Sequence, residues 1–480
     1  MTYQSVQQMV DALGPAATVT AGEVKVLKMD QVPGEVVDDL AATCAFGPDP
    51  EVKGTARWLI RSLASAAGIH PASIHDLYMA MGRREVSGFT VPAINIRAMA
   101  YNSARAAVRA ATRLDAGAVI FEIARSEIGY TEQRPHEYAA IILASALREG
   151  WRGPVFLQGD HCQVSAKKYA GPDRDKELEA LRALIDEEIR AGFYNIDIDT
   201  STLVDLDKPT LQEQQRVNFE LAAELTRFIR AREPKGVTIS IGGEIGEVGG
   251  KNSDVHELRA FMEGYNASRG TGVAGISKIS VQTGTAHGGF VRPDGTVRTD
   301  VKIDLETLRE LSRVAREEFG MGGAVQHGAS TLPPEEFGAF PRVGACEIHL
   351  ATDFQNMIYE HQQFPKDLKE EIYAWLRVNA ADERKPKDTE EQFLYKTRKK
   401  AIGPFKRQMW GLPAPVQHAM GQALEDRFHF LMDQLKVQGS SGVVLKHVKP
   451  PRLPIDRGAE VASAGGSISA SEKKAEGLAD

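Results

Sequence analysis

The stretch GPVFLQGDHCQV, residues 153–164, is followed by an amphipathic segment and then by FYNIDID, residues 193–199. Both runs begin with apolar or β-branched residues, as expected of buried strands in a parallel sheet. Between them, Leu178, Leu181 and Ile185 recur at helical spacing. This part of the chain therefore predicts a strand–helix–strand unit.

The same alternation extends over most of the chain and produces eight strand runs. They are FTVPAIN (89–95), GAVIFEIA (117–124), GPVFLQGD (153–160), FYNIDID (193–199), VTISIGGE (237–244), ISKISVQTG (276–284), GAVQH (323–327) and CEIHLAT (346–352). Strands that alternate with helices favour a parallel sheet, and eight such units have the size of one (β/α)8 barrel. We therefore predict an α/β protein with a TIM barrel and mainly helical extensions.

The segments outside this pattern set the expected domain boundaries. We expect an N-terminal extension over residues 1–85, the barrel over 86–362 and a helical C-terminal extension over 363–450, which is rich in charged and aromatic residues. Residues 451–480 are small, polar and nearly free of aromatics, so we expect a disordered tail.

Composition excludes several classes of partner. The net charge of -7 and the pI near 6.0 give no reason to expect nucleic acid or an anionic membrane. The 3 cysteines, Cys44, Cys162 and Cys346, lie far apart and do not form a disulfide framework. The first residues do not resemble a leader, and no run approaches the roughly 18 apolar residues of a membrane helix. We expect a cytoplasmic protein.

Polar residues end five consecutive strand runs. They are Asp160 with His161, then Asp199, Glu244, His287 and His327. In a parallel barrel all strand carboxyl ends open on one face, so these side chains are expected to converge. Imidazoles and carboxylates suit a zinc-type ion with a position left open for substrate.

Each residue also has a simpler interpretation. A single His at a strand end is more often a hydrogen-bonded structural residue, and a single Asp is often a helix cap. Asp199, followed by Thr200 and Ser201, fits the capping interpretation best. Asp160 and His161 would face opposite sides of a regular strand, so both can serve only if the strand ends there.

Small residues follow two of the histidines. Backbone N–H groups in such loops can approach an anion, and barrels often bind phosphate in late strand–helix loops, although a single glycine more often makes a tight turn. The candidate phosphate contacts are Gly288, Gly289, Gly328, Ser330 and Thr352. GGEIGEVGG does not fit a dinucleotide-binding loop, because it carries a carboxylate within the strand.

Seven blocks resemble, in the family's order, the class II zinc-dependent fructose-bisphosphate and tagatose-bisphosphate aldolases. They are VPAINI, GDHCQV, IDTS, GEIGEVGG, GTAHGGF, QHGAS and ATDFQ, and the resemblance runs from about Ile74 to about Gln355. It implies that zinc is held by His161, His287 and His327, with Glu244 and Asp199 near an alternative or second metal position and Asp160 as general acid/base.

The resemblance also implies a reaction. One or two Zn²⁺ ions, or another divalent metal, would stabilise the enediolate formed when a ketose bisphosphate such as fructose 1,6-bisphosphate is cleaved. It further implies a sugar-phosphate substrate and a homo-oligomer, either a dimer or a tetramer. The need for a monovalent cation is left open.

The sequence departs from the family pattern at two single positions and in one loop. Ala124 stands where the family has a phosphate-binding Ser, and His349 replaces an Asn that contacts the substrate. An acidic loop is replaced by Lys251, Asn252, Ser253 and Asp254. His349 is then a candidate substrate contact or added ligand. Two alternatives stay open: a noncatalytic partner or scaffold subunit of an aldolase complex, and a metal-dependent sugar-phosphate isomerase or epimerase.

Overall fold

The eight predicted runs form a closed parallel barrel in the computed structural model, which describes residues 1–20, 22–246, 251–284, 291–296, 303–330, 332–468 and 470–473. Its strands are β4 (Val91–Asn95), β5 (Ile120–Ala124), β6 (Gly153–Gln163), β7 (Asn195–Asp199), β8 (Ser240–Glu244), β9 (Lys278–Val281), β10 (Ala324–Gln326) and β11 (Glu347–Leu350). They pair in chain order, and β11 pairs with β4 to close the ring. The predicted (β/α)8 architecture is confirmed.

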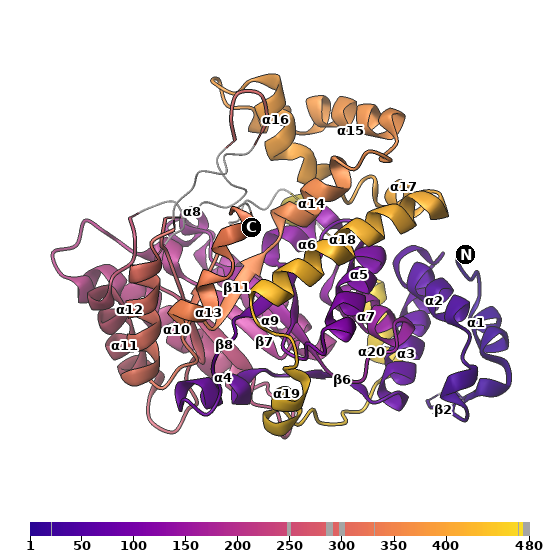
Figure 1. The fold of residues 1–480 in the computed structure, drawn as a ribbon, viewed down its shortest axis with the longest axis horizontal. Coiled ribbons are helices and arrows are strands. Elements are labelled where there is room, and N and C mark those ends of the chain that lie inside the picture. The colour runs from indigo at the N-terminus through magenta and orange to yellow at the C-terminus, as the bar shows by residue number, and fades with distance from the viewer. Residues whose placement is uncertain are drawn as a thin grey trace.

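Helices follow each strand and cover the outside of the barrel (Figure 1). They are α5 (Ala100–Arg113), α6 (Arg125–Thr131), α7 (Pro135–Arg148), α8 (Ala166–Tyr169), α9 (Arg174–Ala191), α10 (Leu211–Arg230), α11 (Val255–Arg269), α12 (Leu305–Glu317), α13 (Ala339–Val343) and α14 (Thr352–Tyr359). On α9 the predicted apolar face is buried, with Leu181 and Ile185 fully covered. The helix ends at Gly192, whose φ of 95° is a left-handed conformation that glycine adopts without strain.

The N-terminal residues form helices, a separate two-stranded sheet and one strand that joins the sheet of the barrel. The elements are α1 (Val6–Leu13), β1 (Ala17–Val19), β2 (Val24–Val26), α2 (Gly34–Phe46), α3 (Pro50–Ala66), β3 (Ile69–Ala72) and α4 (His75–Gly82). β3 pairs in parallel with the first half of β6, from Ile69↔Gly153 to Ala72↔Phe156. The Asn195 side chain accepts from the Ile74 amide at 2.8 Å and thereby ties β7 to this segment.

The C-terminal residues form a second set of helices, with α15 and α16 above the barrel at the top of Figure 1. They are α15 (Lys366–Asn379), α16 (Glu390–Thr397), α17 (Lys406–Trp410), α18 (Ala414–Gln434), α19 (Ser441–His447), α20 (Arg457–Ala464) and α21 (Ala470–Lys473). α18 packs on α5, where Arg109 Nε lies 2.5 Å from Glu425 Oε2. α16 contacts the segment that follows β9: the Thr389 hydroxyl donates to the Pro293 carbonyl at 2.6 Å.

Helix α20 lies within the tail predicted to be disordered, and over these residues the structure differs from that prediction. Glu460 is buried against α3 and α7, where it meets Arg61 at 3.2 Å and His136 at 3.1 Å. These ion pairs anchor a segment with few apolar residues, which hydrophobic pattern alone does not reveal. Among the described residues, no helix is long and apolar enough to span a bilayer.

Candidate metal centre

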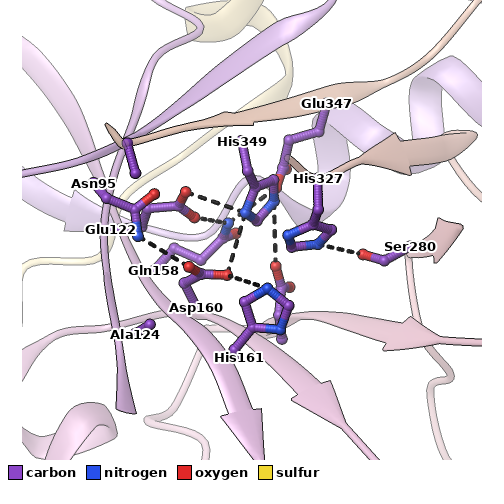
Figure 2. A network of polar contacts seen from close by, with 12 residues as sticks. Asn95, Glu122, Ala124, Gln158, Asp160, His161, Ser280, His327, Glu347 and His349 are labelled. Atoms are coloured by element: carbon purple, nitrogen blue, oxygen red, sulfur yellow. Dashed lines mark hydrogen bonds and ion pairs between the residues drawn. The ribbon is translucent and has the colours of Figure 1, made fainter. Parts of the chain in front are cut away.

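A bulge in β6 decides how Asp160 and His161 are presented. From 159 to 162 three residue steps on β6 face only two on β7, 196–198, so β6 carries one extra residue. His161 takes a left-handed backbone conformation there, with φ of 41°. Both side chains therefore turn into the barrel (Figure 2), although the strand continues to Gln163. The expectation that the strand must end at His161 is wrong, because the bulge re-aims the side chain instead.

Two groups of buried side chains that share His161 could each hold a metal ion. The outer group consists of Asp160, His161 and His327, and the lateral group consists of His161, Asp199 and Glu244. The His161 and His327 rings lie 4.3 Å apart, while His161 Nδ1 lies 3.1 Å from Asp199 Oδ2 and 3.6 Å from Glu244 Oε2. Four of the predicted ligands thus lie together at the carboxyl ends of β6, β7, β8 and β10.

The remaining predicted ligand, His287, lies outside the described residues, as do Gly288 and Gly289. Asp199 combines the two roles weighed from the sequence. Its Oδ1 accepts from the Ser201 amide at 3.1 Å, as a cap does, while its Oδ2 faces His161. The capping and ligand interpretations are therefore compatible.

A third group lies deeper in the barrel and consists of Glu122, Asp160, Asp197 and His349; we call it the inner group. His349 was predicted as a substrate contact or added ligand. Its Nδ1 lies 3.1 Å from Glu122 Oε1 and 3.2 Å from Asp160 Oδ1, as Figure 2 shows. All four side chains are almost completely buried.

Beneath the inner group, Lys278 lies among carboxylates. Its Nζ donates to Asp197 Oδ2 at 2.9 Å and to Gln158 Oε1 at 2.8 Å, and it also pairs with Glu347. Sequence reasoning missed these residues together with Glu122. A signal was present, because Asp197 precedes Asp199 and Glu347 precedes His349 by two positions, so each pair shares one face of its strand.

Burial and neighbouring charges shift the pKa values in opposite directions. Burial opposes ionisation of Asp160, but the charges of His161 and His349 outweigh it and hold the pKa of Asp160 well below its usual range. Burial raises the pKa of Glu122 to about 8. Burial and the nearby Asp199 carboxylate also raise the pKa of Glu244 well above its usual value. Divergent carboxyl pKa values within one cleft are typical of functional sites.

The predicted phosphate contacts among the described residues, Gly328, Ser330 and Thr352, lie at the mouth of the barrel. Gly328 has a φ of 67°, and Ser330 Oγ accepts from the Ala351 amide at 2.6 Å. The Thr352 hydroxyl accepts from Arg97 Nη1 at 3.2 Å. In the altered acidic loop, Lys251 Nζ pairs with Glu257 at 2.8 Å.

A cationic cluster at the mouth was also missed from the sequence. Arg97 is buried and pairs with Glu127, and Lys399, which follows α16, lies 5.7 Å from the centre of the Tyr130 ring. Burial, with the charges of Arg97 and Lys400, lowers the pKa of Lys399 to about 8. Among the described residues, no carboxylate lies within ion-pair distance of Lys399.

The parallel barrel and the imidazoles and carboxylates gathered at one of its ends define a TIM-barrel protein with a candidate metal centre. The chain belongs to the class II fructose-bisphosphate aldolase family, whose model matches residues 80–410. The family predicted from the seven blocks is thus confirmed.

Several solved structures are similar to the chain at low identity. The fructuronate-tagaturonate epimerase UxaE from Cohnella laeviribosi is 11% identical, with a TM-score of 0.53 over 90% of this chain and 91% of that chain. Fructose-bisphosphate aldolase from Campylobacter jejuni is 17% identical, with a TM-score of 0.45 over 77% and 96%. The YdjI aldolase from Escherichia coli K12 is 13% identical, with a TM-score of 0.46 over 77% and 99%.

Proposed function

We propose that the chain is a metal-dependent lyase that reversibly cleaves a carbon–carbon bond in an anionic ketose, such as a ketose phosphate or bisphosphate. The observation that carries this proposal is the convergence of Asp160, His161 and His327 at the carboxyl ends of the barrel strands, in a chain of this family. Donor type supports a metal, because the imidazoles of His161 and His327 are ligands that suit Zn²⁺, with a position left open for substrate beside the Asp160 carboxylate.

In this proposal His161 and His327 hold the ion together with His287, and Asp199 and Glu244 offer an alternative position for it. A divalent cation held there would polarise the ketose carbonyl. Ser280 Oγ lies 2.9 Å from His327 Nε2 and fixes the ring so that the other nitrogen faces the outer group.

Asp160 is the proposed acid/base. In the cleavage direction its carboxylate takes the proton of the hydroxyl next to the breaking bond, an aldehyde forms there, and the electron pair of the bond moves to the carbonyl side. Asn95 donates to Asp160 Oδ2 at 2.9 Å and to Glu127 Oε2 at 2.9 Å. This bridge orients Asp160 relative to the mouth of the barrel.

An anionic substrate is supported by the cationic cluster. Arg97 is neutralised by Glu127, whereas Lys399 is the nearby charge without a carboxylate partner among the described residues. A phosphate or carboxylate group would supply that partner. Ser330 and Thr352 are proposed to add hydroxyl contacts, with backbone N–H groups near Gly288, Gly289 and Gly328.

The test combines metal content by elemental analysis with a coupled assay for triose phosphate released from fructose 1,6-bisphosphate. We expect chelator-sensitive cleavage, and we expect His327→Ala to lose both metal and turnover. His256→Ala is the matched control, because His256 is exposed on α11. No stoichiometric metal in the wild type, or full turnover in His327→Ala, would overturn the proposal.

Product analysis separates the two remaining alternatives. Formation of a single isomer from a ketose would replace cleavage by isomerisation or epimerisation, which share the deprotonation chemistry. Turnover only after addition of a second aldolase subunit would identify the chain as a partner subunit. The homo-oligomer implied by the resemblance remains a prediction, which light scattering of the purified chain tests.

A further inference from the structure

Three polar atoms of the inner group converge without hydrogen bonds. They are Glu122 Oε1, Asp160 Oδ1 and His349 Nδ1, none of which has a hydrogen-bond partner. The imidazole nitrogen lies 3.1 Å from the Glu122 oxygen and 3.2 Å from the Asp160 oxygen, so the three atoms meet as ion-pair partners and not in well-formed hydrogen bonds. All three side chains are completely buried. Buried polar atoms that lack well-formed hydrogen bonds are rare, and this convergence of one imidazole nitrogen and two carboxylate oxygens is also that of a metal-ligand set.

The spacing of these atoms suits a metal ion. Bonds of roughly 2.0–2.2 Å to nitrogen and oxygen place neighbouring ligands of a tetrahedral ion about 3.3–3.6 Å apart. The two contacts of His349 Nδ1, at 3.1 and 3.2 Å, are close to this range. Two carboxylate oxygens and one imidazole nitrogen form a ligand set used by Zn²⁺ and Mn²⁺.

Charge supports a cation at this position. Six buried carboxylates surround the barrel axis: Glu122, Asp160, Asp197, Asp199, Glu244 and Glu347. Among the described residues, Lys278 is the one lysine or arginine in contact with them, and it is shared by Asp197 and Glu347. Buried carboxylates are strongly unfavourable unless they are paired, and a divalent cation between Glu122 and Asp160 would supply such a partner.

The inner atoms are independent of the lateral group. His161, Asp199 and Glu244 can hold one ion without any residue of the set Glu122, Asp160 and His349. The two sets are disjoint, so each can be occupied while the other is filled. His161 and His327, which hold the first ion in the proposed function, also lie outside the set Glu122, Asp160 and His349, so neither position of the first ion competes with the inner ion for ligands.

We propose that Glu122, Asp160 and His349 bind a second divalent cation, of the Zn²⁺ or Mn²⁺ class, deeper in the barrel than the ion that the proposed function requires. The proposal rests on that function for the first ion only. Asp160 uses Oδ1 as the ligand, and its Oδ2, which accepts from Asn95 at 2.9 Å, remains the atom that exchanges a proton with substrate.

The test is the number of ions per chain. Purified chain is loaded with Zn²⁺, freed of weakly bound metal and measured by elemental analysis. We expect about two ions per wild-type chain and about one in His349→Asn, because a two-metal site loses one ion when one ligand set is broken. His136→Asn is the matched control, since His136 is also buried beside a glutamate, Glu460 at 3.1 Å, but lies on α7. It is expected to keep both ions.

A second variant and a spectroscopic measurement protect the test against misfolding. Glu122→Gln should also reduce the count to about one ion, while Glu188→Gln, another buried carboxyl, should not. In Mn²⁺-loaded chain, electron paramagnetic resonance should show coupled ions in the wild type and an isolated ion in His349→Asn. A wild type that binds one ion, or a count unchanged in both His349→Asn and Glu122→Gln, overturns the proposal.

The two proposals fail in different ways. Two bound ions without cleavage of any ketose would overturn the proposed lyase and leave the inner cation in place. Cleavage of a ketose by a chain with a single bound ion and an isolated Mn²⁺ signal would overturn the inner cation and leave the proposed lyase in place.

Discussion

Replacing Lys278 with Met removes the positive charge on which the barrel interior depends. The Lys278 side chain is completely buried, and its Nζ contacts Asp197, Gln158 and Glu347. Met keeps most of the apolar length of the side chain, so the change tests charge more than packing. Two carboxylates would lose their shared partner, and breaking a buried ion pair costs about 3–5 kcal/mol. That is a large share of the roughly 5–15 kcal/mol by which folded proteins are stable.

The assay is urea unfolding of the metal-loaded chain, with the midpoint and slope compared between variants. Lys251→Met is the matched control: Lys251 pairs with Glu257 at 2.8 Å, but its side chain is 58% exposed, so we expect a loss below about 1 kcal/mol. Adding Glu347→Gln to Lys278→Met should recover part of the stability, because it removes one of the carboxylate charges that lost its partner. A loss below about 1 kcal/mol for Lys278→Met would refute the reasoning, because the buried ion pairs would then contribute little.

Two further predictions concern the mouth of the barrel and the bulge. Because the pKa of Lys399 is lowered to about 8, its positive charge is present below pH 8 and lost as the pH rises through that value. Inorganic phosphate should therefore bind to the wild type more weakly at pH 9 than at pH 7. The Lys399→Met variant should bind phosphate about 10- to 100-fold more weakly than the wild type at pH 7, and its affinity should not show this pH dependence. Titration calorimetry measures both affinities, and an unchanged affinity in the variant would contradict the role assigned to Lys399. In Gly159→Ala the new Cβ would lie 2.4 Å from Glu188 Oε2, so we expect a loss of about 1–3 kcal/mol in stability. We also expect weaker Zn²⁺ binding, measured by competition with a chelator. A Zn²⁺ affinity equal to that of the wild type would show that the bulge does not need this glycine.

The barrel could be predicted from the sequence because its strands and helices obey simple periodicities. All eight predicted runs contain a strand of the barrel, and residues at their ends lie together, as the topology of a parallel barrel requires. The bulge could not be predicted in this way. Strict alternation places Asp160 and His161 on opposite faces, and only the extra residue between Gly159 and Cys162 brings both inward.

The polar interior was missed for a related reason. Glu122, Lys278 and Glu347 each lie within a run that has the apolar or β-branched residues of a strand, so the run is recognised as a strand and the charge is passed over. Barrel interiors are usually filled by branched apolar side chains. The inward positions of β5, β9 and β11 carry charged side chains instead. These charges pair with residues of other strands, and a single strand read by itself does not reveal that pairing. Pairs two positions apart, such as Glu347 and His349, were the available signal.

Two of the three departures from the family pattern, at Ala124 and His349, are connected in space, which favours an altered substrate over a lost site. Beside Ala124, at the expected place of a phosphate-binding Ser, Glu127 Oε2 accepts from the Ala124 amide at 2.9 Å and from Asn95 at 2.9 Å. Asn95 also donates to Asp160, whose other oxygen faces His349, the second departure. Decay of an unused site would leave replacements that are unrelated to one another. Here one chain of contacts links both positions through the proposed acid/base, as expected if the surroundings of the metal were rebuilt together for a different anionic ketose.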